Sequence, residues 1–231
     1  MSPSPNAPTP VAIPEPTLKR LPYYYKFIQG QREARRDFVS CTTLAEALGL
    51  NPIQVRKDLQ ATGAVGRPKV GYHVETTLDA IEECLGYHNT QDIFLVGAGH
   101  LGQALLAYPG FAEIGFNLVA AFDADPAKVG REVAGKPILE ASRLSDLVRR
   151  MHIQIAILAV PAAAAQMVTD TLVRAGIRAI WNFTPTRLAV PREVLVQDEN
   201  LLASLSVLSK QLENSRVKSH KESIHGKPEE L

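Results

Sequence analysis

Three glycines and one aspartate form the pattern in this sequence that most directly predicts chemistry. Gly97, Gly99 and Gly102 follow the apolar run of residues 93–96 at Gly-x-Gly-x-x-Gly spacing. In this motif the first glycine permits a tight turn, the second lets the backbone approach a pyrophosphate, and the third lets a helix pack closely on the preceding strand. Asp123 ends a second apolar run, where an acid is expected to bind an adenosine ribose 2′-hydroxyl. The pattern predicts a dinucleotide site; the alternative is a simple strand-to-helix turn with an acid placed by chance.

Two further apolar runs predict the sheet that would hold this site. Residues 153–160 and 179–183 are apolar, and a helix-like segment over residues 162–175 separates them. Strands that alternate with helices build a parallel, doubly wound sheet of the Rossmann type, in which ligands bind beyond the carboxyl ends of the strands. Pro161 and Asn182 also fit ordinary turn residues at strand ends. The residues expected to contact cofactor are Gly97, Ala98, Gly99, His100, Leu101, Gly102, Asp123, Val160, Pro161 and Asn182.

A second pattern, nearer the N-terminus, predicts two short helices joined by a turn. Thr43 and Glu46 form a capping box, in which each side chain satisfies the other residue's backbone amide, and this helix is expected to stop near Gly49. Asn51 and Pro52 then supply the cap and the first residue of the next helix. Two helices this close in sequence form a helix-turn-helix.

The outer face of the second of these helices is basic. Val55 and Leu59 lie four residues apart and are expected to face the core. The glycine-rich residues 63–74 follow, and they predict a hairpin with two cations at its tip, which makes the unit a winged helix. A solvated charged face on a helical hairpin is the alternative. The residues expected to contact DNA are Gln54, Arg56, Lys57, Gln60, Arg67 and Lys69.

Charge and composition restrict the class of protein. Residues 18–75 contain ten Lys or Arg against five Asp or Glu, although the net charge of the whole chain is only +1, and such a local excess of cations is typical of nucleic-acid-binding segments. Cys41 and Cys84 are too few for a disulfide framework, lack metal-ligand spacing and are expected to be structural, so no metal is expected. No apolar run approaches the roughly 20 residues that cross a bilayer. Because no signal-peptide core is present either, we expect a cytoplasmic protein without membrane contact.

The N-terminal part of the chain is expected to contain an arm and one domain. Residues 1–16 hold six prolines among small polar residues and are expected to form a disordered arm. The winged-helix domain is expected over residues 17–87. It would run from a first helix that Thr17 caps to a linker helix that Thr77 caps and Gly86 ends.

The C-terminal part is expected to contain the nucleotide domain and one further helix. The nucleotide domain is expected over residues 90–199. A terminal helix over residues 200–213 repeats leucines at coiled-coil-like spacing, so it needs a partner surface, either on its own domain or on a second subunit. The polar residues 214–231 are expected to be disordered.

Several motifs taken together closely resemble the Rex family of redox-sensing transcriptional repressors. They are Gln54 to Leu59, Val70-Gly71-Tyr72, the VGAGHLG loop, Ala121 to Pro126, Val160-Pro161 with Ala165-Gln166, and Trp181 to Pro185. The resemblance covers about residues 13–213. It implies a homodimer that binds palindromic operator DNA, exchanges its terminal helix between subunits, is released by NADH and so senses the NADH/NAD ratio.

The same resemblance implies three positions that sense the redox state of the nicotinamide: an arginine on the first helix, a tyrosine after the phosphate-loop helix and an aspartate at the start of the terminal helix. In this sequence they fall at Lys26, Tyr108 and Asn200, so only the tyrosine is retained. Asn200 has no carboxylate, and Lys26 lacks the bidentate geometry of arginine. Either Asp198 or Glu199 replaces the carboxylate, or discrimination rests on Tyr108 and on stacking of the nicotinamide ring. We expect a preference for NADH with a charge switch weaker than that of the family.

Two other classes of function compete with a nucleotide-controlled repressor. A small dinucleotide-dependent oxidoreductase needs a proton-transferring residue near the nicotinamide, and His100 and His152 are poorly placed for that role. A regulator that responds to coenzyme A or another nucleotide fits the glycine spacing as well. The repressor explains both domains, so NADH and NAD are expected as effectors, and no enzymatic activity is expected.

Overall fold

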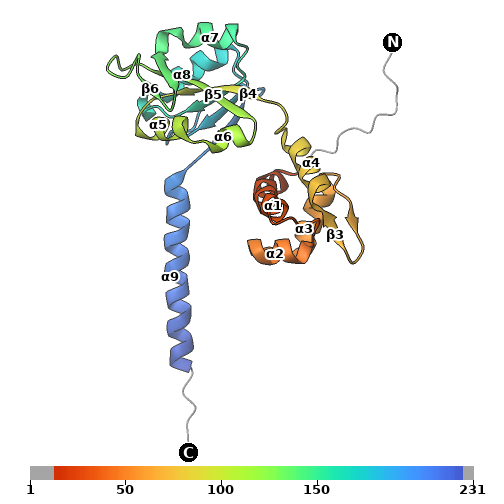
Figure 1. Ribbon diagram of the computed structural model, residues 1–231. Coiled ribbons are helices and arrows are strands. Elements are labelled where there is room, and N and C mark those ends of the chain that lie inside the picture. Colours follow the sequence, from red (N-terminus) through yellow and green to blue (C-terminus); the bar gives the residue numbers. More distant parts are fainter. Residues whose placement is uncertain (1–12, 226–231) are drawn as a thin grey trace, which may run out of the picture. The chain divides into compact units, whose positions relative to one another are not determined.

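The computed structural model describes residues 13–225, and the chain divides between Thr90 and Gln91 into two compact units (Figure 1). The predicted arm over residues 1–16 lies mostly outside the described residues, and it ends sooner than predicted because the first helix begins at Glu15. The elements of the N-terminal unit are α1 (Glu15–Glu33), β1 (Phe38–Val39), α2 (Cys41–Leu48), α3 (Pro52–Ala61), β2 (Gly66–Arg67), β3 (Gly71–His73) and α4 (Val74–Leu85).

Helix α1 starts without a side-chain cap. Pro14 occupies the N-cap position, and Thr17, the predicted cap, is a buried residue inside the helix. A proline in the first helical turn has the φ angle that a helix needs and no amide that must be satisfied, which favours the earlier start. The helix packs the buried side chains of Leu21, Tyr24 and Ile28 into the core of this unit.

Helix α2 also begins earlier than predicted. The Oγ of Ser40 accepts a hydrogen bond from the backbone N–H of Thr43 at 3.0 Å, so Ser40 is the cap and the predicted capping box of Thr43 and Glu46 is wrong. Ser40 offers the same hydroxyl three residues sooner, and the extra turn buries Cys41. The helix ends as predicted at Gly49, which has a φ of +65°.

Helix α3 has the predicted start. Asn51 Oδ1 accepts a hydrogen bond from the N–H of Ile53 at 2.8 Å, and Pro52 is the first helical residue. Val55 and Leu59 are buried in the core, as the spacing predicts. The helix-turn-helix of α2 and α3 is therefore confirmed.

A small antiparallel sheet and α4 complete the N-terminal unit. The strand order is β1-β3-β2, and the β2–β3 hairpin is the predicted wing. Helix α4 begins at Val74 rather than at the predicted cap Thr77, which is buried inside the helix and donates its hydroxyl hydrogen bond to the carbonyl of His73 at 2.7 Å. It ends at Gly86, with a φ of +72°, as predicted.

The second unit is the predicted Rossmann-type fold. Its strands follow the order β10-β9-β8-β4-β5-β7-β6, and all neighbours are parallel except β6 and β7. Helices α7 and α8 pack on one face of the sheet and α5 and α6 on the other. Its elements before the terminal helix are β4 (Gln91–Val96), α5 (His100–Ala107), α6 (Gly110–Glu113), β5 (Phe116–Asp123), β6 (Glu132–Val133), β7 (Lys136–Glu140), the 3-10 turn η1 (Ala141–Arg143), α7 (Leu144–Arg150), β8 (Ile155–Leu158), α8 (Ala162–Ala175), β9 (Ala179–Asn182) and β10 (Leu195–Asp198).

The terminal helix α9 (Leu201–His225) is longer than predicted. The predicted end at residue 213 and the predicted disorder from residue 214 are wrong as far as His225, whereas residues 226–231 lie outside the described residues. The sequence explains the length, because the first glycine or proline after the start of the helix is Gly226. Exposed leucines line the helix at positions Leu202, Leu205, Leu208 and Leu212.

Candidate functional site

A cavity of 860 Å³ lies at the carboxyl ends of strands β4, β5 and β8. This nucleotide crevice, as we call it, is positioned by the parallel sheet, because all three strands end at the same edge. It brings together most of the residues predicted from the sequence to bind cofactor, although these lie in three separate segments. Those that line it are Gly97, Gly99, His100, Leu101, Asp123, Val160 and Pro161.

The three glycines of the loop meet different spatial demands. Gly97 has a φ of +100°, and a Cβ there would clash with the carbonyl oxygen of Ala159. A Cβ on Gly102 would overlap the carbonyl oxygen of Gly97, so this glycine allows α5 to pack against the loop. A Cβ on Gly99 would meet no atom, although Gly99 lines the crevice. Packing within the protein therefore requires glycine at positions 97 and 102 but not at position 99. A pyrophosphate bound against Gly99 would account for the glycine there.

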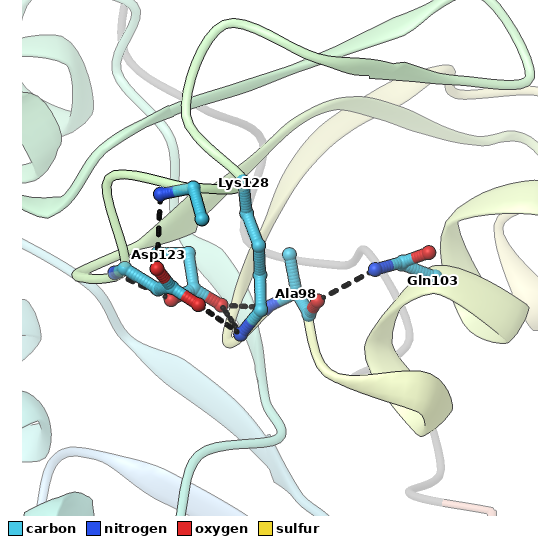
Figure 2. A network of polar contacts seen from close by, with 6 residues as sticks. Ala98, Gln103, Asp123 and Lys128 are labelled. Atoms are coloured by element: carbon cyan, nitrogen blue, oxygen red, sulfur yellow. Dashed lines mark hydrogen bonds and ion pairs between the residues drawn. The ribbon is translucent and has the colours of Figure 1, made fainter.

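Asp123 is the centre of a polar network at the edge of the crevice (Figure 2). Its Oδ2 accepts a hydrogen bond from the N–H of Ala98 at 2.8 Å, and its Oδ1 accepts one from the N–H of Asp125 at 2.9 Å. The ammonium of Lys128 lies 3.2 Å from Oδ2 of Asp123 and 3.6 Å from Asp125. Burial alone would raise the pKa of Asp123, but the two amides and Lys128 outweigh it and hold the pKa below its usual range. The site therefore contains an ionised carboxylate.

Lys128 was not predicted as part of this site. It lines the crevice beside Asp123, and the hydrogen bond to Asp123 raises its pKa above the usual value. Its position five residues after Asp123, across the Asp125-Pro126 turn, was the available signal. Ala98, in contrast, is buried and contributes its backbone: its N–H binds Asp123 and its carbonyl accepts a hydrogen bond from Gln103 at 2.9 Å.

Four residues predicted to contact the cofactor do not line the crevice. Ala98 and Gly102 are the two already described, and the others are Tyr108 and Asn182. Tyr108 follows the last residue of α5, is exposed and packs edge-on against Phe111 with ring centroids 5.5 Å apart. Asn182 is fully buried, and its side chain donates to Asp198 at 2.7 Å and accepts from the N–H of Thr184 at 3.0 Å. The Asn182 side chain thus holds the turn after β9, which agrees with the alternative stated for it above.

The three polar residues before α9 are each held by a specific contact. Asp198 accepts the hydrogen bond from Asn182, and Glu199 accepts one from the indole of Trp181 at 3.0 Å. Asn200 Oδ1 accepts from the N–H of Ala203 at 2.9 Å and so caps α9. Lys26 belongs to the other unit, where it is exposed on α1.

A second cavity, of 480 Å³, lies between α3 and the wing. We call it the basic groove. It is lined by Arg56 and Gln60 of α3 and by Arg67 and Lys69 of the wing, whereas Lys57 is exposed on α3 outside it. The guanidinium of Arg67 lies 5.5 Å from the ring centroid of Phe38. The ion pairs among the described residues include none of these four cations, so their charges are available to an anionic partner.

Asp58 on α3 was not predicted to be important, and it is buried. Its carboxylate accepts hydrogen bonds from α1 and from Gln54 of its own helix. Burial alone would raise its pKa, but the hydrogen bonds, chiefly the one from Arg20, lower the pKa to about 2. The signal was its spacing: Asp58 lies three residues after Val55, on the face that is buried.

Within residues 13–225, no three His, Cys, Asp or Glu side chains lie close enough together to hold a metal ion. Over the same residues, no helix has the length and apolar character that a membrane span requires.

Known proteins resemble both units. A family model described as "CoA binding domain" matches residues 88–186, and one described as "Putative DNA-binding protein N-terminus" matches residues 12–60. The redox-sensing transcriptional repressor Rex of Treponema denticola is 43% identical to this chain over 193 residues, which are 84% of this chain and 92% of that protein. The solved structure of RSP in complex with β-NAD+ and operator DNA has a TM-score of 0.83 at 32% identity and covers 94% of this chain and 100% of RSP. RSP in complex with β-NADH has a TM-score of 0.80 at 32% identity, over 91% and 99% of the two chains.

Proposed function

The chain belongs to the Rex family of redox-sensing transcriptional repressors, and we propose that it represses transcription by binding palindromic operator DNA, from which NADH releases it. One observation carries this proposal: the same chain contains a winged helix with a basic groove, whose cations form no ion pair with another described residue, and a Rossmann unit with a nucleotide crevice. RSP, which resembles the chain over 94% of its length, binds operator DNA and β-NAD+. We propose the cytoplasm as its location, where the operator and the nucleotides are found.

Operator binding is assigned to α3 and the wing. Arg56 and Gln60 would face base edges or phosphates from α3, while Arg67 and Lys69 would contact the backbone or the minor groove beside it. Lys57 would add a phosphate contact from the exposed side of α3. Each phosphate that a cation neutralises releases counterions from DNA, so these residues contribute affinity that falls as salt concentration rises.

The nucleotide crevice is assigned to NADH and NAD. Gly99 leaves room for the pyrophosphate in front of the N-terminus of α5, where the helix dipole favours an anion. Asp123 is ionised and still has acceptor capacity for a ribose hydroxyl. The bound nucleotide supplies no redox step in this proposal; it acts as an effector that binds two arrangements of the protein with different affinity.

A homodimer follows from a palindromic operator, whose two half-sites need two winged helices. Helix α9 is the proposed dimer contact, because its leucines are exposed in the single chain and an exposed apolar surface of this kind marks an interaction site. We propose that it is exchanged between subunits. Removing residues 200–231 should then abolish the dimer, and a truncated protein that stays dimeric and responds to NADH would contradict the exchange.

We propose that the protein distinguishes NADH from NAD by a charge switch that is weaker than the one the family resemblance implies. Asn200 carries no charge and caps α9, and the nearby acid Asp198 is held by Asn182. Tyr108 is exposed, so it remains free to meet a ligand or another subunit. Measuring the NAD/NADH affinity ratio in wild type, Asn200→Asp and Asp198→Asn tests this. If Asn200→Asp leaves this affinity ratio unchanged and Asp198→Asn brings it close to one, the switch lies at Asp198.

Two experiments test the proposed function. Titration of the purified protein with NADH, NAD, NADPH and coenzyme A identifies the effector, and the match to a CoA-binding model makes coenzyme A the necessary comparison. Operator binding by Arg56→Ala, Lys57→Ala, Arg67→Ala and Lys69→Ala across a salt series should show weaker binding, with a salt slope smaller by about one unit where a phosphate contact is lost. Arg174→Ala, on α8 of the other unit, is the control. Unchanged operator affinity in all four variants would contradict the assignment.

A further inference from the structure

The carboxylate of Asp58 is the most heavily bonded side chain of the winged-helix unit as described. It is 1% exposed, and it accepts five hydrogen bonds of 2.7–3.0 Å. The donors are Thr17 Oγ1, Arg20 Nε and Nη2, Tyr24 OH and Gln54 Nε2. Because the pKa of Asp58 is about 2, the carboxylate is ionised near neutral pH. An ionised carboxylate accepts hydrogen bonds and cannot donate any.

This property fixes the orientation of the Gln54 amide. The terminal amide of a glutamine carries an NH2 group, which donates hydrogen bonds, and a carbonyl oxygen, which accepts them. Turning the amide over exchanges the positions of donor and acceptor. In the Gln54 side chain the NH2 group lies 2.9 Å from Oδ1 of Asp58. Turned over, the amide would set its carbonyl oxygen against a carboxylate oxygen, and two acceptors repel. One N–H of the NH2 group is thus committed to Asp58, and the carbonyl oxygen is the end of the Gln54 amide whose hydrogen-bonding capacity is wholly free.

The other partners of Asp58 keep this arrangement rigid. Arg20 binds the carboxylate with two nitrogens at 2.7 and 2.9 Å, and Tyr24 adds a hydrogen bond of 2.7 Å from the core. All these donors come from α1, whereas the residues proposed to contact DNA lie on α3 and the wing. A carboxylate clamped in this way cannot follow the glutamine if the amide rotates.

Gln54 itself is exposed, and it is the third residue of α3. The first turns of a recognition helix are the part that contacts base edges in the major groove. Of the groups that bases present there, only the exocyclic amines of adenine and cytosine donate hydrogen bonds, whereas guanine presents O6 and N7 as acceptors. A side chain whose free end is an acceptor therefore favours adenine or cytosine.

We propose that Gln54 reads an exocyclic amino group in each operator half-site as a fixed hydrogen-bond acceptor, and that Asp58 is the positioning residue that prevents the amide from turning over. This inference rests on the proposed operator binding and adds to it the chemical class of base that Gln54 selects. Gln60 provides the contrast on the same helix, because no contact fixes the orientation of its amide within residues 13–225.

The test uses the full-length protein and synthetic duplexes. A duplex is first selected by the wild-type protein from random sequence, which tests operator binding by itself: a protein that enriches no sequence would contradict the proposed function. In the selected duplex, each adenine is then replaced by purine and each cytosine by pyrimidin-2-one, which remove single amino groups. Each guanine is replaced by 7-deazaguanine, which removes an acceptor. Affinities are measured for wild type, Gln54→Met and the control Gln60→Met.

At one position of each half-site, we expect removal of the amino group to weaken duplex binding by wild type and by Gln60→Met about two- to tenfold, the range for a single net hydrogen bond. Gln54→Met should bind the altered and unaltered duplexes equally. If Gln54 only supported the helix, its loss would weaken all duplexes alike and leave every amine effect in place. That outcome would overturn the proposal. So would a loss of affinity on 7-deazaguanine substitution that is seen in wild type and absent in Gln54→Met, because Gln54 would then donate to guanine.

Asp58→Asn tests the positioning role. An asparagine can donate as well as accept, so the Gln54 amide would be free to turn over. The amine effect should shrink in this variant although Gln54 is still present, and an undiminished effect in a folded Asp58→Asn protein would contradict the role of Asp58. Circular dichroism establishes that the variant is folded. If it is not, the comparison of wild type with Gln54→Met still decides the main proposal.

Discussion

The indole nitrogen of Trp181 donates a hydrogen bond to Oε1 of Glu199 over 3.0 Å. Trp181 lies on β9, and Glu199 lies between β10 and α9. The ring of Trp181 also packs against Phe183 with centroids 4.7 Å apart, and Phe183 lines the nucleotide crevice. Two contacts therefore join the crevice to the segment that leads into α9.

Trp181 should report on nucleotide binding by its fluorescence. It is the only tryptophan of the chain, so its emission can be assigned. The reduced nicotinamide absorbs light in the range in which tryptophan emits, so NADH should quench the emission more strongly than NAD does. Fluorescence titration with both nucleotides measures this. Trp181→Phe, which keeps a ring against Phe183, should lose the signal but keep NADH affinity by calorimetry; equal quenching by NADH and NAD would contradict the expectation.

Gly102 and Gly99 should respond to alanine in opposite ways. Gly102→Ala places a methyl group against the carbonyl oxygen of Gly97, and such overpacking should lower the free energy of unfolding by about 1–3 kcal/mol. A methyl group at Gly99 meets no atom, so Gly99→Ala should leave stability unchanged and weaken NADH binding. Denaturant unfolding followed by Trp181 emission, together with NADH titration, compares the two. Loss of stability in Gly99→Ala would show that the loop is packed differently.

Asp123 and Lys128 should set the preference between NADH and NADPH in opposite directions. The Asp123 carboxylate would repel the 2′-phosphate of NADPH, so Asp123→Asn should raise NADPH affinity relative to NADH by at least about tenfold. Lys128 lies 3.2 Å from that carboxylate and offsets its charge, so Lys128→Met should shift the ratio toward NADH. Calorimetric titration of both nucleotides gives the ratio. An Asp123→Asn protein with the wild-type ratio would remove Asp123 from the selectivity mechanism.

Asp58 should make the stability of the winged-helix unit depend on pH in acid. The folded pKa of about 2 lies below the ordinary 3.8, so the stabilisation is fully present above about pH 4 and is lost as the pH falls through 2. This difference corresponds to about 2 kcal/mol. Asp58→Asn should lose that dependence and should cost about 3 kcal/mol at neutral pH, because Arg20 loses its partner. Circular dichroism during denaturant unfolding at several pH values measures both, and an equally steep acid dependence in the variant would assign it to other groups.

The features that the sequence predicts well are governed by neighbouring residues. The start of α3 depends on Asn51 and Pro52, which lie at the helix end itself. The loop from Gly97 to Gly102 depends on backbone contacts that only glycine tolerates. Local rules of capping and turn geometry are enough in both places.

The features that were missed depend on residues far apart in the chain or on competition between similar signals. Asp58 is bonded to Thr17, 41 residues away, and a carboxylate gives no sign in sequence that a core will supply donors for it. Ser40 and Thr43 are both suitable caps for α2, and burial of Cys41 favours the earlier one. Asn182 ends a strand at the crevice edge, yet its side chain turns into a buried network that depends on Asp198.

The hydrogen bonds between α1 and Asp58 also limit how this protein can be re-engineered. Helix α3, residues 52–61, cannot be transferred alone to an unrelated winged helix. The transferred helix would bury the carboxylate of Asp58 without Arg20 and Tyr24, which neutralise and orient it here. Donor and acceptor scaffolds would have to exchange both helices together. The smallest transferable part of this DNA-binding unit is thus a pair of helices, and α1 belongs to that pair although none of the residues proposed to contact DNA lies on it.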